Sequence, residues 1–261
     1  MLKTLKAVRY VTALREGGSL PAIVEADNGL LYVMKFVGAG QGPKALIAEL
    51  VAGELARALS LPIPEIVLLD LDPILGRSEP NPEIQDLLRF SAGLNLGLRY
   101  LPQAFDFNLL LQPPPPVDLA SHIVWFDAYI TNVDRTPRNV NLLVWEDGLW
   151  LIDHGAALYF HHDWSEGYLE RSQNKFPLIK DHTLLPFASQ LAEVDLLSHQ
   201  SLTPDIIEGI INSIPAVWLG DEPAFANHQA HRAAYLAYLL KRLEAAPLFV
   251  EEALHARQGL V

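Results

Sequence analysis

Residues 131–155 read TNVDRTPRNVNLLVWEDGLWLIDHG, and the interpretation of the whole chain starts from this stretch. Asp134 and Asn139 lie five residues apart in its polar first part. Asp153 stands near its end, two residues before Gly155. Whether these side chains can act together depends on how the residues between them fold.

The segment between Asn139 and Asp153 predicts a β-hairpin. Residues 140–145, apart from Asn141, and residues 149–152 are apolar, and Asp147-Gly148 between them is typical of a tight turn. A hairpin reverses the direction of the chain. We therefore expect Asp153 to return beside the loop that carries Asp134 and Asn139.

This set of residue types suits phosphoryl transfer to a hydroxyl group. One carboxylate can orient the attacking hydroxyl and accept its proton, while a second carboxylate and an amide oxygen can hold magnesium against phosphates. The alternative is that these are ordinary loop residues that cap turns and bind backbone groups. That alternative would be the default for any single residue, but the combination with the hairpin favours a site.

Lys35 is one of only seven lysines, and it lies within the apolar run LLYVMKFV at residues 30–37. Strand alternation places Val33 and Lys35 on the same face, where an apolar side chain could contact a base and the ammonium could contact phosphates. A buried ammonium needs a partner, and Glu49 and Glu54 on the following predicted helix are both candidates. The alternative is an edge-strand lysine that extends to water.

Gly17, Gly18 and Ser19 precede the first predicted strand pair. Paired glycines allow backbone N–H groups to approach a phosphate closely. A Gly-Gly turn between two strands is the commoner explanation of such a pair.

The predicted elements divide at QPPPP, residues 112–116, because four consecutive prolines cannot lie inside a helix or a central strand. Before it we predict strands at 21–27, 30–37, 65–71 and 95–102 and a helix at 44–60. After it we predict a buried helix at 118–130, the hairpin, an irregular stretch to about residue 180, and then helices, one starting at Thr203-Pro204-Asp205 and a long one at 222–246. The layout predicts an α+β protein of two lobes: residues 1–112, a connector at 113–117, and residues 118–261.

Composition excludes several classes of protein. The 31 acidic residues outnumber the 19 Lys and Arg, giving a formal charge of −12, so direct binding to nucleic acid is not expected. Cysteine is absent, which excludes disulfides, thiolate nucleophiles and Cys-based metal sites. The N-terminal stretch is interrupted by Lys and Arg, and apolar runs are too short for a membrane helix. We therefore expect a cytoplasmic protein with no membrane partner.

Taken in order, these motifs resemble the protein-kinase-like fold. The order is a Gly-rich turn, the VMK strand, a Glu-bearing helix, a linker, Asp134 with Asn139, the hairpin, and Asp153-His154-Gly155. Ordinary protein kinases carry His-Arg-Asp where this chain has Asn132-Val133-Asp134. NVDRTPRN with IDHG is most similar to HipA-like kinases and, more distantly, to phosphoinositide kinases. The resemblance implies a two-lobed fold with a small β-rich N-lobe that has one main helix, and a mostly helical C-lobe.

The resemblance also implies a role for each matching residue. Lys35 would contact the α- and β-phosphates of ATP and pair with Glu49, and Gly17–Ser19 would cover the phosphates. Asp134 would be the catalytic base within a catalytic loop at 131–141. Asn139 and Asp153 would bind Mg²⁺. Val33, Tyr100 and Leu101 would contact adenine, with residues 100–103 as the hinge between the lobes.

The chain departs from the family at three places. Ser19-Leu20-Pro21 stands where HipA proteins usually carry a Gln-Pro-Lys-like stretch, so a phosphate-binding lysine is missing there. His154 replaces the Phe of Asp-Phe-Gly. The chain is also too short to hold the additional N-terminal subdomain of HipA itself, and we expect a stand-alone kinase core.

Three functions follow as hypotheses. The first is an ATP- and Mg²⁺-dependent kinase whose acceptor is a hydroxyl, most simply Ser or Thr of a protein, with lipids or small molecules as alternatives. The second is a nucleotide-binding pseudokinase that acts as a regulatory module. The third is a metal-dependent hydrolase built on His161, His162 and Asp163 together with His154, which is the weakest because adjacent residues seldom face one metal. Arg135 and Arg138 could bind transition-state charge or form surface ion pairs.

Overall fold

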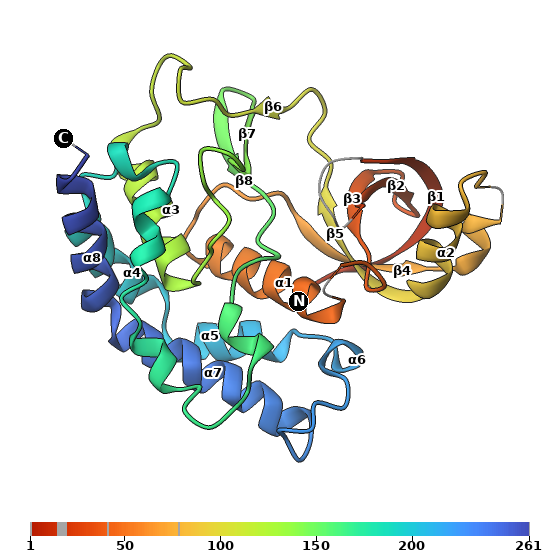
Figure 1. Cartoon of the computed structure of the whole chain (residues 1–261). Coiled ribbons are helices and arrows are strands. Elements are labelled where there is room, and N and C mark those ends of the chain that lie inside the picture. Colours follow the sequence, from red (N-terminus) through yellow and green to blue (C-terminus); the bar gives the residue numbers. More distant parts are fainter. Residues whose placement is uncertain (1, 15–19, 41, 78, 261) are drawn as a thin grey trace.

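The computed structural model describes residues 2–14, 20–40, 42–77 and 79–260. The N-terminal strands form a closed barrel in the order β1-β2-β3-β5-β4, and the C-terminal part is mainly helical, as Figure 1 shows. The barrel strands are β1 (Thr4–Ala13), β2 (Ala22–Ala26), β3 (Leu31–Lys35), β4 (Ile66–Leu71) and β5 (Gly93–Arg99). The expected fold class, with a β-rich N-terminal region and a helical C-terminal region that carries a hairpin, is confirmed.

Alternation along β3 determines which side chains enter the barrel. Tyr32 and Met34 are buried in the barrel interior, whereas Val33 and Lys35 face outward from it toward the helical part. This is the division of faces that the sequence predicted. The sequence did not predict β1. This strand closes the barrel by pairing antiparallel to β2 and parallel to β4.

Two α-helices accompany the barrel. α1 (Pro43–Ala58) is the predicted helix, and its first turn begins with a proline. α2 (Pro82–Phe90) was not predicted, although Asn81 caps it by accepting a hydrogen bond from the Glu83 N–H. A short 3₁₀ helix, η1 (Pro73–Gly76), precedes α2.

The predicted hairpin is present as β7 (Leu142–Trp145) and β8 (Gly148–Leu151). The short strand β6 (Phe105–Asp106) pairs with β7 and extends the hairpin to a sheet. The chain therefore joins the hairpin soon after it leaves β5 and before it reaches the proline run.

The helical part begins with α3 (Val117–Tyr129), as predicted. It continues with the 3₁₀ helices η2 (Tyr159–His162), η3 (Glu170–Gln173), η4 (Pro177–Asp181) and η5 (Leu185–Phe187), and with α4 (Leu191–Ser201), α5 (Pro204–Asn212), α6 (Ala216–Leu219), α7 (His228–Glu244) and α8 (Ala246–Gln258). Thr203 caps α5, as expected. The predicted helix at 222–246 is wrong at its start, because Asn227 caps α7 by accepting from the Ala230 N–H.

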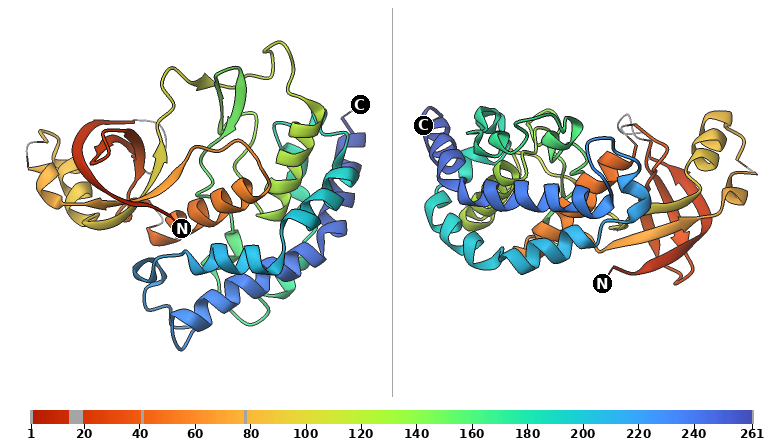
Figure 2. Two further views of the ribbon diagram at one scale, coloured as in Figure 1. Left: turned by 180° about the vertical axis from the view of Figure 1, so that it is seen from behind. Right: turned by 90° about the horizontal axis from the view of Figure 1, so that it is seen from below.

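The main hydrophobic core joins α1 to the C-terminal helices. Leu50 and Leu55 of α1 share one buried cluster with Trp125 of α3 and Phe249 of α8, whereas the barrel interior forms a second cluster. Both views in Figure 2 place α1 beside the C-terminal helices. Although α1 follows the barrel strand β3 in sequence, it packs as part of the helical region.

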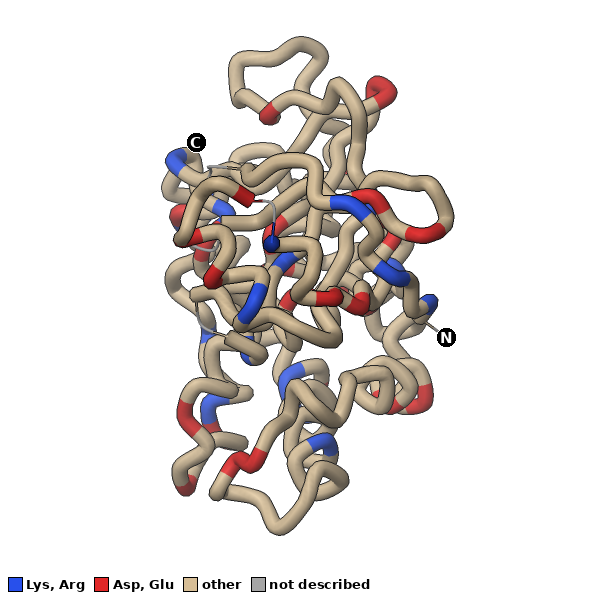
Figure 3. The backbone as a smooth tube through the Cα atoms, turned by 90° about the vertical axis from the view of Figure 1, so that its right-hand side faces the viewer, with Lys and Arg blue, Asp and Glu red and all other residues tan. Residues whose placement is uncertain are grey.

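Charged residues are spread over the molecule. In the view of Figure 3, basic positions alternate with acidic ones and do not gather into a continuous stripe. Across the described ranges, every helix is either too short or too polar to cross a membrane.

Candidate active site

A cleft of about 900 Å³ lies between the barrel and the hairpin. Lys35 on the outer face of β3 lines one side of it. Asp134 and Asn139, from the loop after α3, and Asp153, after β8, line the other. The hairpin therefore returns Asp153 to the loop as the sequence predicted, and the four side chains share one cavity.

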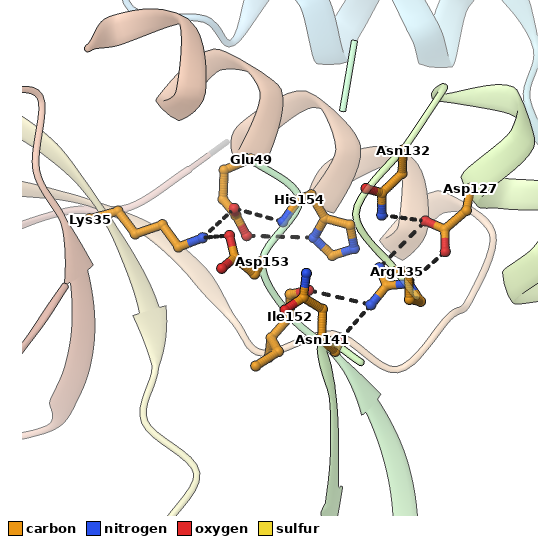
Figure 4. A network of polar contacts seen from close by, with 9 residues as sticks. All are labelled: Lys35, Glu49, Asp127, Asn132, Arg135, Asn141, Ile152, Asp153 and His154. Carbon is orange, nitrogen blue, oxygen red and sulfur yellow. Dashed lines mark hydrogen bonds and ion pairs between the residues drawn. The ribbon is translucent and has the colours of Figure 1, made fainter. Parts of the chain in front are cut away.

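Lys35 lies at the centre of the charged contacts in the cleft. Its ammonium donates to Glu49 Oε2 at 2.6 Å and to Asp153 Oδ1 at 2.6 Å, as Figure 4 shows. Glu49 is fully buried on α1 and also accepts from the backbone N–H of His154 at 2.8 Å. This carboxylate therefore joins β3, α1 and the segment that carries Asp153.

The Lys35–Glu49 contact fixes the charge state of both groups. Burial alone would raise the pKa of Glu49, but the Lys35 ammonium and the contact with His154 outweigh it and lower the pKa to about 2. Burial alone would lower the pKa of Lys35, but Glu49 and Asp153 together raise it. Both side chains are therefore charged at neutral pH.

Of the two possible partners for Lys35, the structure selects Glu49. Glu54 lies five residues farther along α1, which is about 1.4 turns, and instead contacts the guanidinium of Arg57. The five-residue spacing therefore places the two glutamates on different faces of α1. Glu49 faces Lys35 at the cleft, and Glu54 lies beside Arg57 of the same helix.

Asp134 and Asn139 contact each other directly. The Asn139 Nδ2 group donates to Asp134 Oδ2 at 2.7 Å, which leaves the amide oxygen of Asn139 available. The backbone bonds between Thr136 and Asn139 close the loop into a tight turn. This turn explains how two residues five positions apart meet in one cavity.

The donor set in the cleft fits a divalent cation. The Asp153 side chain is 50% exposed and the Asn139 side chain is exposed, and both line the cleft. Carboxylate and amide oxygens are the ligands that magnesium takes in phosphate-binding sites. Asp153 adopts a left-handed backbone conformation with φ of 55°, an arrangement often found at functional sites.

The cleft also has apolar lining. Val33, Leu98 and Leu101 line it together with Tyr100 and Ala104. Apolar side chains of this kind can contact the faces of a planar base. Val33, Tyr100 and Leu101 thus line the same cleft as Lys35, and their contact with adenine stays a prediction. Gly17, Gly18 and Ser19 lie outside the described residues.

Sequence reasoning misjudged Arg135. The guanidinium is fully buried and donates from Nε to Asp127 Oδ2 at 2.5 Å, so neither of the two expected roles, a transition-state contact or a surface ion pair, holds. Arg138, by contrast, is exposed and lines the cleft. Asp127 was missed altogether, although a carboxylate within the apolar run at residues 123–130 is itself a signal for a buried partner.

The residues of the proposed metal hydrolase have other partners. His161 is buried and contacts the hydroxyl of Tyr235 at 3.0 Å, and burial holds its pKa well below the usual value. Asp163 caps the turn at Ser165 and pairs with Arg171 at 3.1 Å. These contacts account for both residues as structural groups.

Comparisons with known proteins show the family and the fold. A family model described as HipA-like kinase matches residues 8–251. The crystal structure of a Helicobacter pylori proinflammatory kinase, CtkA, superposes over all of both chains with a TM-score of 0.62 at 13% identity. The Golgi casein kinase with Mn/ADP bound superposes with a TM-score of 0.51 at 11% identity, covering 96% of this chain and 73% of that one. No curated protein matches the sequence.

Proposed function

This chain belongs to the HipA-like kinase family, and on that premise we propose that it is an ATP- and Mg²⁺-dependent kinase that phosphorylates Ser or Thr hydroxyls of a protein. Membership of the family makes the chain a phosphotransferase, and a kinase family implies ATP and a divalent metal. The acceptor and the roles of individual residues are our proposal.

One observation supports the proposal most strongly. Lys35, held between Glu49 and Asp153, and the Asp134–Asn139 pair line the same cavity, which apolar side chains line as well. A nucleotide needs both kinds of lining. The faces of its planar base contact apolar side chains, while its phosphates need cations and metal ligands.

Each residue then has a defined task. Lys35 binds phosphate oxygens, and Glu49 keeps its ammonium charged and correctly aimed. Asp134 accepts the proton of the attacking hydroxyl, because its carboxylate lies in the cleft on the turn that precedes the hairpin. Val33 and Leu101 exclude water around the base.

Asn139 and Asp153 would hold the divalent cation. A cation bound there neutralises phosphate charge as the γ-phosphoryl group moves to the acceptor. The Lys35 ammonium holds the Asp153 carboxylate in the cleft through their 2.6 Å contact.

The first experiment is a thermal-shift titration with ATP and Mg²⁺ on wild type and on Asp153→Asn. A ligand at 100 times its dissociation constant stabilises a protein by about 2.7 kcal/mol, so a clear Mg²⁺-dependent shift is expected in wild type and a much smaller one in the variant. Asp147→Asn is the matched control, because Asp147 lies in the turn of the same hairpin and is exposed. No shift in wild type would contradict the proposed ATP site.

The second experiment measures phosphoryl transfer itself. Asp134→Asn is expected to lower kcat by about 10² to 10⁴-fold while ATP-dependent stabilisation remains, because a general base acts on the acceptor and not on nucleotide binding. Labelled ATP is supplied with a Ser/Thr-containing protein mixture, with phosphoinositide vesicles, and with small polyols. Mg²⁺-dependent ATP binding without transfer to any acceptor would favour the nucleotide-binding pseudokinase.

A further inference from the structure

The buried guanidinium of Arg135 contacts both halves of the catalytic apparatus. Arg135 directly follows Asp134 in sequence. Its Nη1 group donates to the backbone carbonyl of Asn141, at the end of the catalytic loop, and at 3.4 Å to the carbonyl of Ile152, directly before Asp153. Figure 4 shows this side chain reaching from the loop to both carbonyls.

Asp127 on α3 holds the other side of the guanidinium. It accepts from Arg135 Nε at 2.5 Å and from Asn132 Nδ2 at 2.9 Å. The Asn132 side-chain oxygen in turn accepts from the backbone N–H of Asp134 at 3.2 Å. A single carboxylate on a rigid helix is thus connected to the catalytic loop by two routes.

His182 completes the shell around Asp127. Its Nε2 lies 2.8 Å from Asp127 Oδ2, while its Nδ1 accepts from the Leu184 N–H at 3.0 Å. An acceptor at Nδ1 means that Nε2 carries the proton and donates to the carboxylate. Although burial alone would raise the pKa of Asp127, Arg135 and His182 outweigh it and hold that pKa far below its usual value, so the carboxylate is ionised.

None of these side chains is arranged to touch a substrate. Arg135, Asp127 and His182 are all buried, and within the described residues none of the three lines the cleft. Arg135 instead donates to the backbone carbonyls of Asn141 and Ile152, and Asp127 and His182 hold Arg135 in place. These three side chains can therefore influence the reaction only by positioning the residues that line the cleft.

We propose that Arg135, anchored by Asp127, is a positioning residue that fixes Asp153 relative to the catalytic loop 131–141. The inference rests on the proposed function, because it assigns Asp153 and Asn139 to one cation and Asp134 to the acceptor. Arginine is required at this position because its planar fork reaches a carboxylate on one side and two carbonyls on the other, whereas a lysine ammonium is a compact point charge.

The test is Arg135→Lys, which keeps the positive charge beside Asp127 but cannot reach both carbonyls. We expect the Mg²⁺ concentration needed for ATP-induced stabilisation to rise about 10-fold, and kcat to fall about 10- to 100-fold with little change in KM for ATP at saturating Mg²⁺. Arg242→Lys is the matched control. Arg242 is also fully buried and donates to the carbonyls of Ala128 and Ser172, outside the catalytic loop.

The outcomes separate the inference from the function on which it rests. If Arg135→Lys only lowers the melting temperature, as Arg242→Lys does, and leaves both the Mg²⁺ requirement and kcat unchanged, the inference is wrong. If wild type binds ATP and Mg²⁺ but transfers no phosphoryl group, the proposed kinase activity is wrong, and the Mg²⁺ titration alone decides the inference. If Arg135→Lys does not fold, Asp127→Asn is expected to give the same rise in Mg²⁺ requirement, and its absence overturns the proposal.

Discussion

Two buried carboxylates, Glu49 and Asp127, organise the site at the scale of single residues. Each is fully buried, and each is neutralised by a cation from another segment, Lys35 for Glu49 and Arg135 for Asp127. Removing one partner of such a pair leaves an uncompensated buried charge and costs about 3–5 kcal/mol. The contacts that shape the cleft therefore also contribute to folding.

The Lys35–Glu49 pair predicts an acid-sensitive contribution to stability. The pKa of Glu49 is about 2 in the folded protein against an ordinary 4.5, so its contribution is complete above pH 4.5 and is lost as the pH falls toward 2. Glu49→Gln cannot titrate there. We expect the variant to be less stable than wild type at pH 7 but to lose less of its unfolding free energy between pH 5 and pH 2.5, measured by urea denaturation.

Glu65→Gln is the control for this prediction. Glu65 pairs with Lys3 at the surface, where the two side chains are 45% and 69% exposed, and exposed pairs contribute about 0–1 kcal/mol. Its pH profile should follow that of wild type. Parallel profiles for wild type and Glu49→Gln would mean that Glu49 is not the group that responds to acid.

Single residues were predictable where local pattern and chemistry agreed. Lys35 stood out as an ammonium in an apolar strand, and the choice between Glu49 and Glu54 needed only the helix orientation that the structure provides. The role of Arg135 could not be predicted from the sequence. Its partners are a carboxylate on α3 and two backbone carbonyls, and the sequence does not reveal which backbone carbonyls a side chain will contact. Asp127 had a signal, a charge inside an apolar helix.

At the scale of elements, the barrel positions Lys35 through the close packing of β3, β4 and β5. Gly97 on β5 is paired with Met34 of β3 and with Val67 of β4. A Cβ atom at Gly97 would lie 2.5 Å from Leu69 Cδ1 and 2.9 Å from both Leu69 Cγ and Val67 Cγ2. Glycine is required there because side chains of β4 fill the space beside its backbone.

Gly97→Ala is therefore expected to destabilise the protein by about 1–3 kcal/mol, since overpacking forces neighbouring side chains or strands to move. Gly209→Ala is the matched control: Gly209 lies in α5, and a Cβ there meets nothing within 4 Å. In a helix that change is neutral or stabilises by up to about 1 kcal/mol. Urea midpoints of the two variants should move in opposite directions, and a Gly97→Ala midpoint equal to that of wild type would contradict the packing argument.

Two of the three elements that the sequence did not predict, β1 and β6, depend on their pairing partners. β1 alternates charged and apolar residues and is largely exposed, so its strand character depends on pairing with β2 and β4. β6 has only two residues and is defined by its partner β7. α2 is different, because Asn81-Pro82 is a recognisable helix start that was overlooked.

At the scale of the whole molecule, the boundary drawn at the proline run does not coincide with the boundary of the hydrophobic core. Leu46 and Leu50 of α1 belong to the same buried cluster as Ile123 and Phe249, and the indole of Trp218 on α6 donates to the carbonyl of Leu94 on β5 at 3.0 Å. The sequence predicted two lobes from the connector, and that division remains a prediction. Long-range packing of this kind is invisible in local sequence patterns.

This shared core predicts that residues 118–261 do not fold alone. Without residues 1–112 the helical fragment would expose the surface that α1 covers, and a large exposed apolar surface favours aggregation or a loosely packed state. We expect wild type to unfold in one calorimetric transition, and the fragment to retain helical far-UV signal without a near-UV signal or a cooperative melt.

Co-expression of fragments 1–112 and 118–261 is the control, because the missing core surface is then supplied in trans and the cooperative transition should return. A fragment 118–261 that melts cooperatively by itself would mean that α1 adds only marginally to the stability of the helical region, and that the connector does separate two independent folding units.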